Sequence, residues 1–197
     1  MKNSFDLLID SFIDNKIGID KGFINKNLSN GLQQNIVQLQ EDGLMTAAGI
    51  GNEEVMDSKQ NMRGDKIYWM DKTHTNIFEQ EFLSNVENFI KYLNQTCYTG
   101  INGYEFHYAV YEAGSGYKRH KDQFKNNSSR KYSFIHYLNE SWEEENGGNL
   151  LIYQNDSVQQ ISPKSQTAVF FKSDEIEHEV SKSNRSRMSV TGWLKRL

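Results

Sequence analysis

The chain of 197 residues has few of the features that mark secreted, membrane-spanning or nucleic-acid-binding proteins. Its single cysteine, Cys97, excludes an intrachain disulfide and favours a reducing compartment. No apolar run approaches the length of a membrane span, and the first residues lack the basic-then-apolar pattern of a signal peptide. A formal net charge of −4 has the wrong sign for a general nucleic-acid binder. We therefore expect a cytoplasmic protein with no nucleic-acid partner and no membrane partner.

Proline is also scarce, with one residue in the chain, and no internal repeat, linker or low-complexity tail is visible. The length fits a single domain over 1–197 and is sufficient to bury a sizeable core. We expect Cys97 to be a small buried residue near the end of a helix, without a redox role.

The first half of the chain, 1–100, carries apolar residues at helical spacing. Three segments show this spacing: 5–13, 28–39 and 76–96. The second stripe stops just before Gly43, a residue type suited to the end of a helix. These stripes predict helices that pack one face against a core.

From about residue 104 to residue 197, short runs rich in β-branched and aromatic residues are separated by turn signals. The predicted strands are 104–112, 131–139, 149–153, 167–172 and 185–195. Many short strands are typical of a sandwich or barrel. The sequence thus predicts an α+β, mainly β fold: a double-sheet jelly roll with the N-terminal helices packed on its outside.

A candidate metal site lies in this second half. His120 and Asp122 are two residues apart, which on a β-strand places both side chains on one face. Taken alone, the pair is better explained as a surface histidine beside a solvated aspartate. His178 could complete a facial set of two imidazoles and one carboxylate, which leaves half of an octahedron open. Non-haem Fe(II) oxygenases use this arrangement.

A second polar feature begins at Arg187, nine residues after His178. From there the residues alternate between the two faces of a predicted strand. One face carries polar groups and an indole, from Arg187, Ser189, Thr191 and Trp193. The other face carries apolar groups, from Met188, Val190 and Leu194. An arginine that points into a barrel needs an anion, because a buried unpaired charge is costly. A dicarboxylate ligand would supply that anion through a bidentate contact.

Five stretches between about residue 60 and the C-terminus follow the order of one known family. They are 63–69 (Arg-Gly-Asp-Lys-Ile-Tyr-Trp), 101–103, 116–122, 136–139 with Trp142, and 178–193. They resemble the prolyl hydroxylases that depend on Fe(II) and 2-oxoglutarate. The resemblance is greatest to the branch of animal enzymes that hydroxylate hypoxia-inducible factor and to their bacterial relatives. The Arg-Gly-Asp-Lys-Ile run is specific to this branch, whereas many oxygenases share the metal-ligand set.

The resemblance implies a double-stranded β-helix with Fe(II) bound by His120, Asp122 and His178. It further implies 2-oxoglutarate and O2 as co-substrates and ascorbate as reductant, with no catalytic side chain beyond the metal centre. The residues implied for 2-oxoglutarate are Arg187 and Tyr137, at the distal carboxylate, and Tyr111 on the neighbouring strand.

The resemblance also implies a substrate surface made of Arg63, Asp65, Trp69 and Arg130. Asp65 and Arg130 match a pair that ties a loop to the barrel rim, and the loop of roughly 50–75 would fold over an extended peptide. The implied reaction hydroxylates a prolyl residue of a protein and releases succinate and CO2. The bacterial relatives are thought to act on elongation factor Tu, which makes a translation factor one candidate. The alternatives are a hydroxylase of free amino acids or small peptides, and a non-catalytic metal-binding jelly-roll module.

Three residues need separate comment. The segment between Tyr111 and His120 is one residue shorter than in the animal enzymes, which bears on the placement of Tyr111. His107 stands where those enzymes carry an apolar residue. We expect it to be a hydrogen-bonded histidine near the co-substrate, because a fourth ligand would occupy an open metal position. His136 faces the opposite way from Tyr137, and we expect it to pack under the helices.

Overall fold

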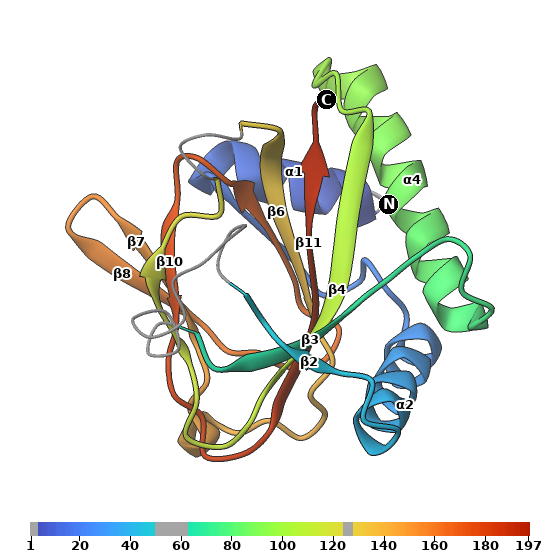
Figure 1. Ribbon diagram of the computed structural model, residues 1–197. Helices are drawn as coiled ribbons and strands as arrows, with labels where there is room; N and C mark the ends of the chain where they lie inside the picture. Colours follow the sequence, from blue (N-terminus) through green and yellow to red (C-terminus); the bar gives the residue numbers. More distant parts are fainter. Residues whose placement is uncertain (1–3, 50–62, 124–127) are drawn as a thin grey trace.

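The computed structural model describes residues 4–49, 63–123 and 128–197, and within them it contains three α-helices and two antiparallel sheets (Figure 1). The helices are α1 (Ser4–Asn15), α2 (Lys26–Glu41) and α4 (Ile77–Cys97). The first strands are β1 (Ile17–Asp20), β2 (Thr46–Ala47), β3 (Asp65–Trp69), β4 (Gly103–Tyr111), β5 (Tyr117–His120) and β6 (Arg130–Tyr137). The later strands are β7 (Leu150–Gln154), β8 (Ser157–Ile161), β9 (Ala168–Lys172), β10 (Glu177–Val180) and β11 (Arg187–Lys195). None of the described helices is long and apolar enough to cross a membrane.

The two sheets form the predicted jelly roll. The larger sheet has the order β1-β9-β6-β11-β4-β3-β2, and the smaller has the order β5-β10-β7-β8. In Figure 1 the helices lie on the outer side of the larger sheet, and the smaller sheet lies on its other side. The prediction of a jelly roll with N-terminal helices packed outside it is therefore confirmed.

Strand β4 shows how this layering creates a site. Its residues Phe106, Tyr108 and Val110 belong to the apolar cluster shared with the helices. The alternate residues His107, Ala109 and Tyr111 face the space between the two sheets and line a cavity there. Because the helices cover one face and the second sheet covers the other, the strand is buried on both sides. A polar side chain on its inner face must therefore find its partner inside the cavity.

The three predicted helices correspond to α1, α2 and α4. Helix α2 begins after Asn25, whose side chain accepts a hydrogen bond from the backbone N–H of Leu28 at 2.8 Å. It ends just before Gly43, which has a φ of +68°. The expectation for Cys97 was wrong, because this residue is exposed at the last position of α4.

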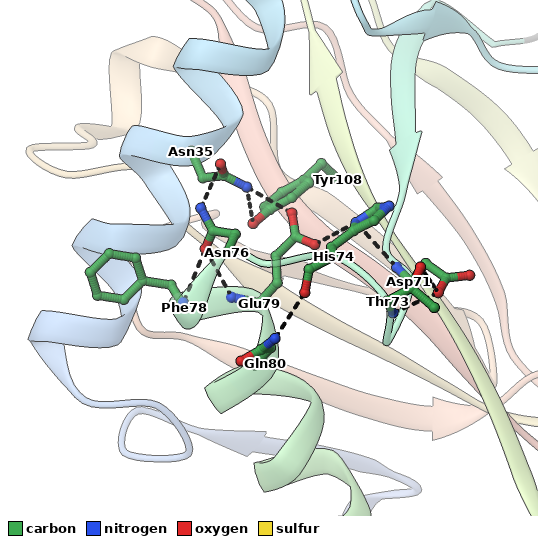
Figure 2. Close-up of polar contacts among 9 residues, drawn as sticks. All are labelled: Asn35, Asp71, Thr73, His74, Asn76, Phe78, Glu79, Gln80 and Tyr108. Atoms are coloured by element: carbon green, nitrogen blue, oxygen red, sulfur yellow. Dashed lines mark hydrogen bonds and ion pairs between the residues drawn. The ribbon is translucent and has the colours of Figure 1, made fainter.

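A buried polar network joins the helical layer to β4 (Figure 2). The Asn35 side chain of α2 donates hydrogen bonds to Glu79 of α4 at 2.7 Å and to the Tyr108 hydroxyl of β4 at 3.0 Å. Its oxygen accepts a hydrogen bond from Asn76 at 2.8 Å, and Asn76 in turn caps α4. The second oxygen of Glu79 lies 2.8 Å from Nδ1 of His74 in the loop that follows β3. The network therefore fixes two helices and one loop against the back of the site-bearing strand.

We expect Asn35→Ala to lower the free energy of unfolding by about 1–3 kcal/mol, because it leaves buried polar partners without hydrogen bonds. Urea denaturation of the variant and the wild-type protein measures this difference. The matched control is Gln34→Ala on the exposed face of the same helix, which should change stability by less than about 0.5 kcal/mol. Equal stability of the two variants would show that the network contributes nothing measurable.

Candidate active site

Two adjacent strands of the smaller sheet bring the predicted metal ligands together. His178 of β10 lies directly opposite His120 of β5 in the antiparallel register. The spacing had suggested that His120 and Asp122 share one strand. Strand β5 ends at His120, however, and Asp122 lies in the bend that follows. Its carboxylate nevertheless lies 3.4 Å from Nε2 of His120 and 3.6 Å from Nε2 of His178. The ligand atoms of the three residues lie within 4.8 Å of one another.

Backbone carbonyls orient both imidazoles. Nδ1 of His120 lies 2.7 Å from the carbonyl oxygen of Lys118, and Nδ1 of His178 lies 3.3 Å from that of Ile176. An Nδ1–H that donates to a carbonyl leaves the Nε2 lone pair free, and both Nε2 atoms point to the carboxylate. Burial lowers the pKa of His178, which keeps this ring neutral and able to bind a metal.

The Asp122 carboxylate is held in its charged form. Burial by itself raises the pKa of this carboxyl, but the neighbouring His178 and His120 rings outweigh burial and lower it. The hydroxyl of Ser133 acts in the same direction by donating a hydrogen bond to Oδ2 at 2.6 Å. Two imidazole nitrogens and one oriented carboxylate fit a facial set for Fe(II).

The same cavity contains a buried cation. Arg187 is 2% exposed, and its guanidinium lies over the rings of Tyr137 and Tyr111 at 4.9 and 5.2 Å from their centroids. Its Nε–H donates to the carbonyl oxygen of Gly148 at 2.9 Å, and a side chain at Gly148 would contact the Arg187 stem at 3.2 Å. The register places Tyr111 of β4 directly opposite Arg187 of β11.

Among the described residues, no carboxylate forms an ion pair with Arg187. The buried Tyr137 hydroxyl also lacks a hydrogen-bond partner among them. An unpaired buried guanidinium is costly, and a carboxylate that accepts two of its N–H groups removes that cost. The Tyr137 hydroxyl can donate a further hydrogen bond to the same anion. This is the donor set that one carboxylate of 2-oxoglutarate requires.

Of the four residues predicted for the substrate, Arg63 and Asp65 line the cavity, while Trp69 and Arg130 contact the lining residue Trp193. Their pairing differs from the expectation. Asp65 accepts two hydrogen bonds from Arg63, at 2.6 and 2.8 Å, and Arg130 donates to Glu105 at 2.7 Å. In the part of the chain that the structure describes, the expected pair of Asp65 with Arg130 is therefore replaced by two separate pairs.

The loop expected at 50–75 lies outside the described residues for its portion 50–62, and the expectation was wrong for Asp65–Trp69, which form strand β3 and pair with β4. Trp69 stands at the rim, 46% exposed. The guanidinium of Arg130 lies over the ring of Trp193, 3.5 Å from its centroid.

His107 lies in the cavity wall, but without the expected hydrogen bond. Its ring packs against both Trp69 and Trp193, with centroid distances of 4.9 and 5.4 Å, and the two indoles also contact each other at 6.4 Å. Neither ring nitrogen has a partner within the described ranges. His136 packs under the helices against Phe23 and Phe82, as expected.

Two polar residues of the site were missed from the sequence. Ser133 orients Asp122, and Glu105 pairs with both Arg130 and Lys195. Ser133 lies four residues before Tyr137 on β6, so both side chains are on the inner face of the strand. This spacing could have indicated Ser133 from the sequence.

Comparisons with known proteins agree with this geometry. The family model described as the 2OG-Fe(II) oxygenase superfamily matches residues 106–195. Human Egl nine homolog 1 is 27% identical over 201 residues, which are 98% of this chain and 47% of that protein, so the chain spans about half the length of this relative. Mouse prolyl hydroxylase EGLN3 is 27% identical over 87% of this chain and 74% of its own length.

Solved structures give a similar result. A prolyl-4-hydroxylase from Pseudomonas putida superposes with a TM-score of 0.89 and 27% identity, and the match covers 98% of this chain and 100% of that one. A prolyl hydroxylase from Trichoplax adhaerens, solved with a peptide of the hypoxia inducible factor oxygen degradation domain, has a TM-score of 0.86 and 25% identity over 98% and 89% of the two chains. With the fold, the metal-ligand set and the matched segment in agreement, the chain is similar to the 2OG-Fe(II) oxygenase superfamily over residues 106–195 and to the prolyl hydroxylases over nearly its whole length.

Proposed function

We propose that the chain is an Fe(II)- and 2-oxoglutarate-dependent dioxygenase that hydroxylates a prolyl residue of a protein and releases succinate and CO2. The observation that carries the proposal is one cavity lined both by the His120, Asp122 and His178 set and by the unpaired guanidinium of Arg187. The first group suits a metal with open positions, and the second suits a carboxylate.

Each part of the cavity has a defined task in this reaction. Fe(II), when bound, supplies the activation of O2, and ascorbate keeps the metal reduced. Arg187 and Tyr137 bind the distal carboxylate of 2-oxoglutarate and so fix its orientation, with Tyr111 beside them. Ile135, Leu150 and other apolar residues of the lining exclude water from the reacting carbon. No side-chain acid or base is required, and we assign none.

Two observations support a prolyl residue within a protein as the target. The relatives are named as prolyl hydroxylases, and one of the solved structures holds a peptide. The cavity is bordered by the indoles of Trp69 and Trp193, which offer flat apolar surfaces to a proline ring. A cytoplasmic translation component such as elongation factor Tu is one candidate substrate. Free amino acids and small peptides are the second candidate class.

The test incubates the purified protein with Fe(II), 2-oxoglutarate, ascorbate and O2, together with elongation factor Tu, a denatured lysate or free proline in separate reactions. We expect succinate formation and a mass increase of one oxygen on a proline of a protein. A His178→Ala variant serves as the inactive control. Hydroxylation of free proline alone would assign the second class, and no succinate under any condition would leave the non-catalytic module as the better explanation.

A further inference from the structure

His107 is a buried polar group that the proposed reaction leaves without a task. It is 1% exposed, it lines the same cavity as the metal ligands, and neither of its nitrogens has a partner within the described residues. Leaving a buried hydrogen-bonding group unpaired costs about 1–3 kcal/mol. Packing alone does not explain the residue, because an apolar ring would pack against Trp69 and Trp193 without this cost.

His136, on β6 of the same sheet, is a second histidine of this kind but outside the cavity. This second imidazole is also buried and also lacks a partner among the described residues. It lies among the rings of Phe23, Phe82 and Phe134, away from the cavity, so no ligand can reach it. His107, in contrast, belongs to the wall that a ligand contacts.

The position of His107 along β4 assigns it to the substrate and not to 2-oxoglutarate. It lies four residues from Tyr111, the residue opposite Arg187, which corresponds to about 13 Å of strand. Its cross-strand neighbours are Thr191 of β11 and the half-exposed Trp69 of β3. His107 therefore lies toward the rim of the cavity, where a substrate enters.

The charges around the rim favour a neutral group in the substrate. The two nearest cations are paired, Arg63 with Asp65 and Arg130 with Glu105. Burial, helped by Arg63 and Arg130, lowers the pKa of His107 to about 3, so its ring is neutral and offers one donor and one acceptor. The indole N–H of Trp193, in the same cavity wall, also lacks a partner among the described residues.

We propose that His107 and the indole N–H of Trp193 form a substrate-recognition pair, which hydrogen-bonds a backbone amide group of a peptide substrate beside the metal. A peptide carbonyl accepts from these donors, whereas the two described arginines of the rim, Arg63 and Arg130, already pair with carboxylates and do not offer a free counterion to the charged ends of an amino acid. The inference rests on the proposed function and deepens it, because it selects peptides over free amino acids. His107 acts here as a specificity-determining residue, and the reaction itself needs no proton from it.

The test compares two small probes that differ only in their termini. One is N-acetylproline N-methylamide, which carries the two flanking peptide groups, and the other is free L-proline. Binding to the Fe(II)- and 2-oxoglutarate-loaded protein is measured without O2 by tryptophan fluorescence, to which Trp69 and Trp193 contribute. We expect the wild-type protein to bind the diamide more tightly than proline, and we expect His107→Phe to weaken diamide binding about five- to tenfold.

Three variants separate recognition from packing. His107→Gln restores an amide donor and acceptor and should retain diamide binding better than His107→Phe. Trp193→Phe removes the indole N–H together with part of the ring surface, and it should weaken diamide binding, measured for this variant by calorimetry because it also removes a fluorophore. His136→Phe makes the same substitution outside the cavity and should leave diamide binding unchanged. The affinity for 2-oxoglutarate should be the same in His107→Phe as in the wild-type protein.

Undiminished diamide binding by His107→Phe would overturn the inference, and so would the absence of diamide binding to the wild-type protein up to the solubility limit. A parallel loss of 2-oxoglutarate affinity in His107→Phe would instead assign the residue to the co-substrate site. The proposed function is judged separately, by succinate formation with a protein substrate, so its failure is distinguishable from the failure of this pair.

Discussion

Asp122→Ala is expected to lose Fe(II) binding and 2-oxoglutarate turnover by more than about 100-fold, since even the loss of a group that only orients a ligand costs 10–100-fold. Asp122 supplies the only negative charge among the three ligands, and it lies 3.4 and 3.6 Å from the Nε2 atoms of the two histidines. Its removal leaves two neutral imidazoles, which hold a hard divalent ion weakly. Metal content after dialysis and succinate release measure the two effects.

Asp174→Ala is the matched control, because Asp174 is exposed in the turn before β10 and takes no part in the cavity. Ser133→Ala should give an intermediate loss of about 10–100-fold, because it keeps the three ligands but removes the hydrogen bond to Asp122, together with a contact to Ser173. Wild-type turnover in Asp122→Ala, with circular dichroism unchanged in all three variants, would disprove the assignment of the metal site.

Arg187→Ala is expected to weaken 2-oxoglutarate binding by about 2–5 kcal/mol, which is roughly 30-fold or more in the dissociation constant. The guanidinium is buried and lies between two tyrosine rings, and no described carboxylate pairs with it, so the ligand's own carboxylate is its natural partner. Arg187→Lys should bind with intermediate affinity, since it keeps the charge but not the bidentate geometry. Anaerobic calorimetry with 2-oxoglutarate gives the dissociation constants.

Arg185→Ala provides the control for Arg187, because Arg185 is exposed two residues earlier and donates to the backbone oxygen of Ser141. It should leave 2-oxoglutarate binding within about twofold of the wild type, as for a solvated charge outside the site. A common affinity for Arg187→Ala and the wild-type protein would rule out Arg187 as the anchor. A large fall in melting temperature without a change in affinity would assign the residue to the fold instead.

The sequence predicted the longer elements because their patterns are local. The apolar stripe of α4 and the alternation that starts at Arg187 are each complete within one segment, and both appear in the structure. Strands β1, β2, β3, β5, β8 and β10 were not among the predicted strands. Each has five residues or fewer, and pairing with other strands defines them more than their composition does.

In the site, too, local patterns were predictable and contacts between distant segments were not. Residue types and spacing indicated His120, Asp122, His178 and Arg187, because their chemistry is unusual in a barrel. The ring contacts of His107 could not be predicted, since they depend on the register of three strands. That register places Trp69 of β3 beside His107 of β4. The ion pair of Asp65 could not be predicted either. Asp65 takes the nearby Arg63 as its partner, and no pattern in the sequence distinguishes this choice from Arg130.

Strand β4, like β6 and β11, has one face against the helical layer and the other toward the cavity. Tyr108, which receives the hydrogen bond from Asn35 of α2, stands between His107 and Ala109 in the chain, and these two side chains point to the opposite side. Anything that loosens the helical layer therefore shifts the wall that faces the substrate, whereas the metal ligands stand on β5, on the adjoining bend and on β10 in the other sheet. A change in the helical layer is therefore expected to act directly on the sheet that carries the substrate wall and the 2-oxoglutarate residues Arg187, Tyr137 and Tyr111, and to reach the metal site only through the hydrogen bond from Ser133 to Asp122.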